Sequence, residues 1–177
     1  MSFQSFSFLA FLVVTLAVCL TVGRKNRAVG MLLLAVANAV FYVQGGGWKS
    51  FFVLLLASGV TLSMVRLMRM SQKATERRRA FVAGALAHVL LLTAVKYSGF
   101  LTGGAIQAPF VPLGISFFTF QQLWLLKEVY TGQFRLEADW KLLLQSFFFP
   151  CVTSGPILRP GDFYPQLEGE KFLHPDG

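Results

Sequence analysis

Long apolar stretches separated by short polar or basic segments dominate the pattern of this chain. The first, residues 3–22, contains no charged side chain, and the others cover about residues 28–43, 48–65, 80–95 and 110–126. About 20 apolar residues are enough for a helix to cross a bilayer. The pattern therefore predicts an all-α, polytopic bundle of transmembrane helices that forms one multi-span membrane domain, with a turn at Gly45–Gly47 between the second and third spans.

A last apolar run, from Trp140 to Val152, is shorter than the others and contains Pro150. Proline removes a backbone hydrogen bond and interrupts a helix, and irregular backbone at membrane depth is tolerated only where protein or a watery cavity surrounds it. We expect a broken or re-entrant helix over residues 140–157.

Basic residues gather between the apolar spans, in the loops predicted at residues 24–27 and 66–79. The positive-inside rule predicts that both loops are cytoplasmic and that the amino terminus lies outside. The first basic cluster follows the apolar run at 3–22 instead of preceding it, so this run is expected to be a retained helix and not a signal peptide.

Composition supports a membrane protein, because 55% of the residues are hydrophobic and only 14% are charged. The net charge of +8 follows from the loops, so it does not indicate nucleic-acid binding. Cys19 and Cys151 both lie in apolar runs and are expected to be small hydrophobic side chains. His88 and His174 are the only histidines and lie far apart, so no metal site is predicted.

Polar side chains recur within the fifth apolar span at Ser116, Thr119 and Gln122. At this spacing they share one side of a helix. The stripe alone favours packing against a neighbouring helix, and the alternative is the wall of a cavity or tunnel. His88 lies within the fourth span without an acid near it in sequence, which favours an interhelical hydrogen bond over a proton-handling role.

A second polar segment follows Pro150. Ser154, Gly155 and Pro156 form a turn directly after an apolar run, and Arg159 follows closely. Exposed amides and a guanidinium here can hold an anionic group such as a phosphate, or a thioester carbonyl. The alternative is that Arg159 only extends to lipid head groups.

Several motifs in order resemble those of the membrane-bound O-acyltransferase (MBOAT) family, in particular its bacterial branch that acetylates alginate and related polysaccharides. They are Lys96-Tyr97-x-x-Phe100, Pro112-Leu-Gly-Ile-Ser-Phe-x-Thr-Phe-Gln121, Val129-Tyr130-x-Gly132 and Phe149-Pro-x4-Gly155-Pro-Ile-x-Arg159, followed by Asp162-Phe-x-Pro-Gln-Leu167. The chain resembles the amino-terminal part of such a protein. It departs from the pattern at Glu128, where Asp is usual, and at Thr131, where Arg is usual.

The resemblance implies transfer of an acetyl or other acyl group from a cytosolic thioester donor, across a bacterial inner membrane, to hydroxyls of an exported polysaccharide. The donor is expected to be an acyl-CoA or a carrier-bound thioester, with no bound cofactor. Partners are then the lipid bilayer and exported acetylation proteins. The candidates for the donor side or tunnel are Ser116, Thr119, Gln122, Ser154, Gly155, Pro156 and Arg159.

The family's catalytic histidine is expected beyond Gly177, so no catalytic residue is assigned within these residues and the chain alone is expected to be inactive. A truncated or split reading frame is one explanation of this. Two other classes stay open, namely a transporter or channel subunit and a non-catalytic membrane scaffold. A transporter half would be expected to show an internal repeat with paired broken segments, which the sequence lacks.

Overall fold

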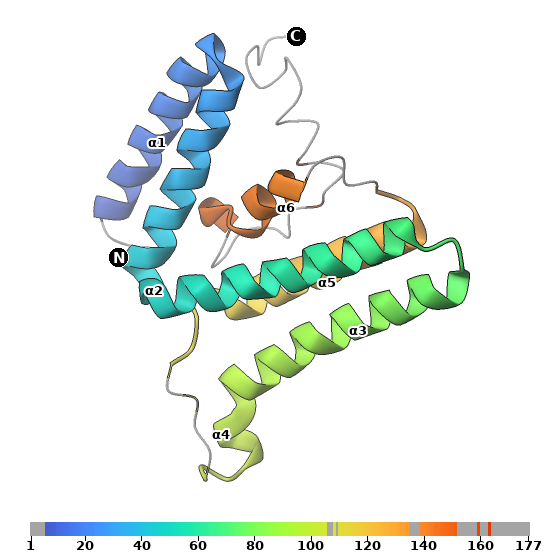
Figure 1. The fold of residues 1–177 in the computed structure, drawn as a ribbon. Helices are drawn as coiled ribbons and strands as arrows, with labels where there is room; N and C mark the ends of the chain where they lie inside the picture. The colour runs from blue at the N-terminus through green and yellow to red at the C-terminus, as the bar shows by residue number, and fades with distance from the viewer. Residues whose placement is uncertain are drawn as a thin grey trace.

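The predicted all-α fold is confirmed. The computed structural model describes residues 6–105, 108, 110–134, 139–151, 159 and 163, and within them every regular element is a helix (Figure 1). Two helical segments, Ala28–Met70 and Ala74–Leu101, are long and apolar enough to cross a membrane, and Phe8–Gly23 is a shorter apolar helix.

Helices α1 (Phe6–Lys25) and α2 (Arg27–Met70) form a tight hairpin. Asn26 begins α2, because its Oδ1 accepts hydrogen bonds from the backbone N–H groups of Ala28 and Val29, at 3.1 and 3.3 Å. The helices touch at two glycines, where a Cβ on Gly30 would lie 2.7 Å from the Cα of Gly23. Only glycine permits this approach of one backbone to another.

The turn expected at Gly45–Gly47 is instead a bend within α2. Gly47 has φ 75° and ψ 167°, a non-helical conformation that side chains other than hydrogen strongly disfavour. Figure 1 shows α2 changing direction, so that its first part lies beside α1 and its second part beside other helices.

The loops expected at residues 24–27 and 66–79 are much shorter in the structure. Between the described helices α1, α2 and α3 (Ala74–Leu92), only Asn26 and residues 71–73 lie outside a helix. Lysine and arginine are good helix formers, so a helix continues into a basic segment after its apolar residues end. The α3 helix itself continues through a π-helical turn, η1 (Thr93–Tyr97), into α4 (Ser98–Leu101).

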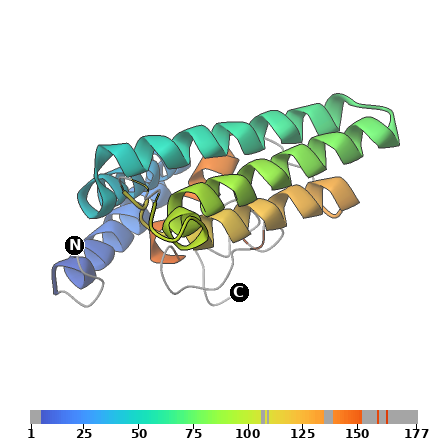
Figure 2. The same cartoon turned by 90° about the horizontal axis from the view of Figure 1, so that it is seen from below.

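Helix α5 (Ile115–Thr131) packs against both α3 and the second part of α2, so that each of these three helices contacts the other two. Figure 2 shows α5 lying along α3, and Figure 1 shows it behind the second part of α2. The short helix α6 (Asp139–Ser146) and the 3-10 turn η2 (Phe149–Cys151) follow, and both contact α2. Eight residues rise about 12 Å, so α6 is too short to cross a bilayer.

Two apolar clusters hold these helices together. One joins α2, α3, α5 and α6 through Val65, Met68, Ala80, Leu125, Leu126, Val129 and Leu142, with Phe163. The other contains most of the aromatic contacts and joins α2, α5 and η2 through Phe41, Tyr42, Leu54, Ala57, Ile115, Phe118, Phe147 and Phe149. The rings of Phe41 and Phe149 are 5.2 Å apart, so they fix η2 against the first part of α2.

Most of the surface of the long helices is apolar and exposed. In their most apolar stretches only 33% of the residues of Ala28–Met70 and 17% of those of Ala74–Leu101 are buried within the protein. A core helix of a soluble protein would be mostly buried. Exposed side chains such as Leu32, Leu56 and Leu90 therefore need lipid or further protein around them.

Candidate functional site

The polar stripe of α5 points in two directions. Ser116 is half-buried, and its Oγ accepts a hydrogen bond from Lys96 Nζ at 2.9 Å. Thr119 and Gln122 are buried instead, with 0% and 1% of their surface exposed. The structure thus separates Ser116, which lies in the first turn of the helix, from the two side chains inside the bundle.

Gln122 faces the short helix α6. Its Nε2 donates to Ser146 Oγ at 2.8 Å, and the neighbouring Gln121 Nε2 donates to the backbone carbonyl of Gln145, also at 2.8 Å. Gln122 Oε1 and Thr119 Oγ1 have no hydrogen-bond partner among the described residues. Packing against α6 therefore uses one end of the Gln122 amide and leaves two buried oxygens available.

His88 lies on α3 and makes the interhelical hydrogen bond that its isolated position favours. Its Nε2 and Thr61 Oγ1 on α2 are 2.7 Å apart, and 1% of the histidine surface is exposed. The other ring nitrogen, Nδ1, has no partner among the described residues. Thr61 was not predicted as a site residue, although a lone threonine in an apolar run is the signal that could have found it.

These polar residues lie at a similar depth in the bundle. On α3, Gly84 packs against Leu126 of α5, where a Cβ would meet Leu126 Cδ1 at 3.0 Å. One helical turn farther along α3 is His88, and one turn back along α5 is Gln122. The His88 and Phe118 rings are 6.0 Å apart, which is consistent with antiparallel helices. We call Thr61, His88, Thr119, Gln122 and Ser146 the buried polar layer.

The layer is unusual for apolar helices. A polar atom without a partner in hydrocarbon costs several kcal/mol, roughly, so such atoms normally face a partner or a cavity. Three unpartnered atoms, His88 Nδ1, Thr119 Oγ1 and Gln122 Oε1, come from α3 and α5. Chemically, Gln122 Oε1 can accept a hydrogen bond from a hydroxyl group, the Thr119 hydroxyl can also donate to a carbonyl, and His88 Nδ1 donates or accepts according to its tautomer.

An apolar cavity of about 380 Å³ between α2 and α3 has His88 in its lining. Val53, Leu56, Ala57 and Val60 of α2 and Ala87 and Leu91 of α3 form the rest of its lining. Leu56 is 73% exposed, so the cavity opens on the apolar outer face of these two helices. Its lining suits hydrocarbon and offers no polar group except His88.

Arg159 lies against the indole of Trp124 on α5. Its guanidinium carbon is 5.5 Å from the centre of the ring, and Lys127 Nζ is 4.6 Å from the same centre. Trp124 Nε1 donates to Glu128 Oε1 at 2.6 Å. The predicted turn residues Ser154, Gly155 and Pro156 lie outside the described residues.

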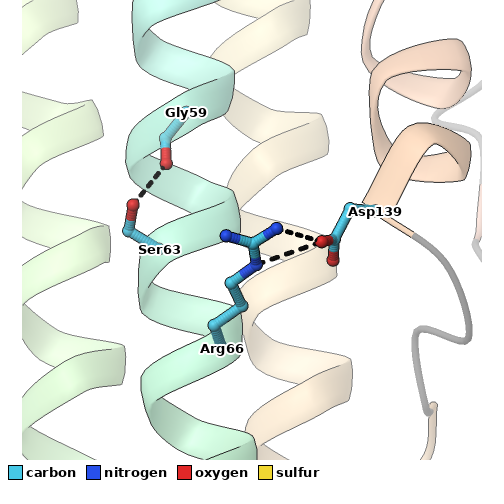
Figure 3. A network of polar contacts seen from close by, with 4 residues as sticks. All are labelled: Gly59, Ser63, Arg66 and Asp139. Atoms are coloured by element: carbon cyan, nitrogen blue, oxygen red, sulfur yellow. Dashed lines mark hydrogen bonds and ion pairs between the residues drawn. The ribbon is translucent and has the colours of Figure 1, made fainter.

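A polar contact at the end of α2 was missed entirely from the sequence. Arg66 binds Asp139, the first residue of α6, through both Nε and Nη2, with 3.1 Å between Nε and Oδ2 (Figure 3). One turn earlier, Ser63 Oγ donates to the carbonyl of Gly59 in the same helix. The ion pair thus joins α6 to the basic end of α2 and helps to set where the Gln145–Ser146 end of α6 meets α5.

No group of three or more His, Cys, Asp or Glu side chains that could hold a metal ion occurs in the described part of the chain. Cys19 and Cys151 are free thiols and half-buried. His174 lies outside the described residues.

The all-α fold and the long, exposed, apolar helices together define a membrane protein. The chain is 31% identical to the probable alginate O-acetylase AlgI of Pseudomonas aeruginosa over an alignment of 189 positions, which covers 94% of this chain. It spans about a third (34%) of the length of that relative. The predicted resemblance to the alginate branch is confirmed. No protein-family model and no solved structure matches the chain.

Proposed function

We propose that these residues form the amino-terminal part of an O-acyltransferase that transfers an acetyl or other acyl group to hydroxyls of an exported polysaccharide. The observation that carries the proposal is the similarity to a probable alginate O-acetylase over nearly the whole chain. The buried polar layer supports it, because a purely structural anchor has no need of unpartnered polar atoms inside apolar helices.

Acyl transfer from a thioester needs a path through the membrane and groups that orient the acyl carbonyl and the attacking hydroxyl. In this proposal Thr119 and Gln122 border that path and offer hydrogen bonds to the carbonyl or hydroxyl. His88 has one nitrogen bonded to Thr61. By resemblance the general base lies in the part of the relatives that this chain does not cover, so in this proposal His88 orients neighbouring groups.

The ends of the bundle differ in charge, and this supports a direction for the transfer. Six basic residues gather where α2 ends and α3 begins, namely Arg66, Arg69, Lys73, Arg77, Arg78 and Arg79. The positive-inside rule makes this the cytoplasmic end. We propose a multi-pass protein of the bacterial inner membrane, in which a soluble thioester donor arrives at this end and exported acetylation proteins act on the other side.

An exchange experiment tests the function. The segment of the P. aeruginosa relative that aligns with this chain is replaced by residues 1–177, and the exchange protein is expressed in a strain that lacks the relative. The control carries the original segment rejoined at the same junctions. Acetyl esters on secreted alginate are expected to return with both proteins. An exchange protein that reaches the membrane in normal amount and produces only unacetylated alginate contradicts the proposal.

A further inference from the structure

Two cations lie over one aromatic ring at the carboxyl-terminal part of α5. Lys127 Nζ and the Arg159 guanidinium carbon are 4.6 and 5.5 Å from the centre of the Trp124 ring. Both cationic side chains are largely exposed, and neither has an ion-pair partner among the described residues. We call these three residues the Trp124 cluster.

Two nearby cations of the basic end are already engaged with other groups. Arg77 Nη2 donates to the Tyr130 carbonyl at 3.2 Å, and Arg66 is bound to Asp139. The acid next to the cluster, Glu128, accepts the indole N–H of Trp124. Because Glu128 holds the indole in place, the ring is a fixed platform, while the two cations keep hydrogen-bond donors that no described acid uses.

We propose that the Trp124 cluster binds a phosphate group. A phosphate oxygen accepts strongly from ammonium and guanidinium donors, and the guanidinium can make two parallel hydrogen bonds to it. Both cations lie close to the centre of the same ring, so the phosphates of one diphosphate ligand can reach both of them.

The ligand class follows from where the cluster lies, and this step rests on the proposed function. Lys127 is near the end of α5 beside the start of α3, since the Phe81 and Tyr130 rings stack at 4.8 Å. This is the basic end at which a soluble thioester donor would arrive. A donor with a phosphorylated carrier group, such as a nucleotide-bearing acyl thioester, places its phosphates here while the acyl group continues toward the buried polar layer.

A phospholipid head group carries the same phosphate chemistry, and the two sources are separated by experiment. The chain is reconstituted into nanodiscs of phosphatidylcholine alone, and binding of coenzyme A is measured by a titration. In a second arm, native mass spectrometry measures retention of phosphatidylglycerol from mixed nanodiscs. Lys127→Ala and Arg159→Ala are each expected to weaken binding of one of the two probes about tenfold, as loss of a charge-assisted hydrogen bond does.

Two further variants make the test specific. Arg159→Lys keeps the charge and is expected to recover most of the binding. Lys49→Ala removes an equally exposed cation just after the bend of α2 and is expected to change nothing. If the two alanine variants weaken binding of coenzyme A, the site belongs to the donor. If they weaken retention of phosphatidylglycerol, the site belongs to lipid. If Lys127→Ala and Arg159→Ala bind both probes as tightly as the unchanged chain, or if the unchanged chain binds neither, the phosphate site is wrong.

The exchange protein separates failure of this site from failure of the proposed function. Normal acetylation by exchange proteins that carry Lys127→Ala and Arg159→Ala, together with unchanged binding of both coenzyme A and phosphatidylglycerol, overturns the site and leaves the function. An exchange protein that cannot acetylate alginate, while the chain still binds phosphate through Lys127 and Arg159, overturns the function and leaves the site.

Discussion

Replacing Thr61 with valine removes one hydroxyl from the buried polar layer and keeps the volume of the side chain. His88 Nε2 then loses its partner at 2.7 Å while its ring stays 1% exposed. An interhelical hydrogen bond in a membrane contributes about 0.6–1.7 kcal/mol. A buried polar atom left unpaired costs about 1–3 kcal/mol. We therefore expect Thr61→Val to lower the free energy of unfolding by about 1–1.7 kcal/mol, the overlap of these two ranges.

The assay is unfolding of the purified chain in mixed micelles, titrated with sodium dodecyl sulfate and followed by circular dichroism. Ser63→Ala is the matched control. The Ser63 hydroxyl is on the same helix, but it is exposed and hydrogen-bonds only within that helix. We expect Ser63→Ala to change the free energy of unfolding by no more than about 0.5 kcal/mol. In a His88→Leu background, Thr61→Val should cost little. Equal effects of Thr61→Val and Ser63→Ala would refute the interhelical bond as a stabilising contact.

Two further predictions concern contacts that the sequence alone does not reveal. Gly30→Ala places a Cβ 2.7 Å from Gly23 Cα, so α1 and α2 must separate, and the free energy of unfolding should fall by about 1–3 kcal/mol. Gly59→Ala meets no atom within 4 Å and should stabilise by about 0.5–1 kcal/mol; equal effects at both glycines contradict the close crossing. Arg66→Ala should expose α6 to faster proteolysis at low salt, because it removes the ion pair with Asp139. The difference from the unchanged chain should shrink near 1 M salt, roughly, where the Debye length is about 3 Å; a difference that salt leaves unchanged argues against the ion pair.

The apolar pattern predicts the helices well because the length of an apolar run and the absence of charge determine what can lie in a bilayer. Their ends are harder to predict. Three consecutive glycines suggest a turn, yet only Gly47 leaves the helical conformation, and the packing of η2 on the first part of α2 accompanies the bend. Basic residues mark a membrane boundary but do not end a helix, since Lys and Arg favour helix as well.

The candidate site is predictable only in part. The spacing of Thr119 and Gln122 shows that they share a side of α5, but not that Ser146 on a short helix would face Gln122. The pairing of His88 with Thr61 depends on the register of α2 against α3, which side-chain packing sets and no local pattern encodes. The Trp124 cluster brings together Trp124 and Arg159, which are far apart in the sequence, so its geometry also depends on tertiary structure.

The central claim is that the buried polar layer serves acyl transfer, and one measurement tests it most directly. Gln122→Met keeps the length and apolar packing of the side chain and removes both its hydrogen bond to Ser146 and its unpartnered oxygen. Leu125→Met, also buried on α5, is the control. Acetyl esters on alginate secreted by the exchange protein are measured at matched protein amounts. We predict at least a tenfold loss, roughly, for Gln122→Met and near-normal acetylation for Leu125→Met. Equal, near-normal acetylation by the two variants would contradict the account.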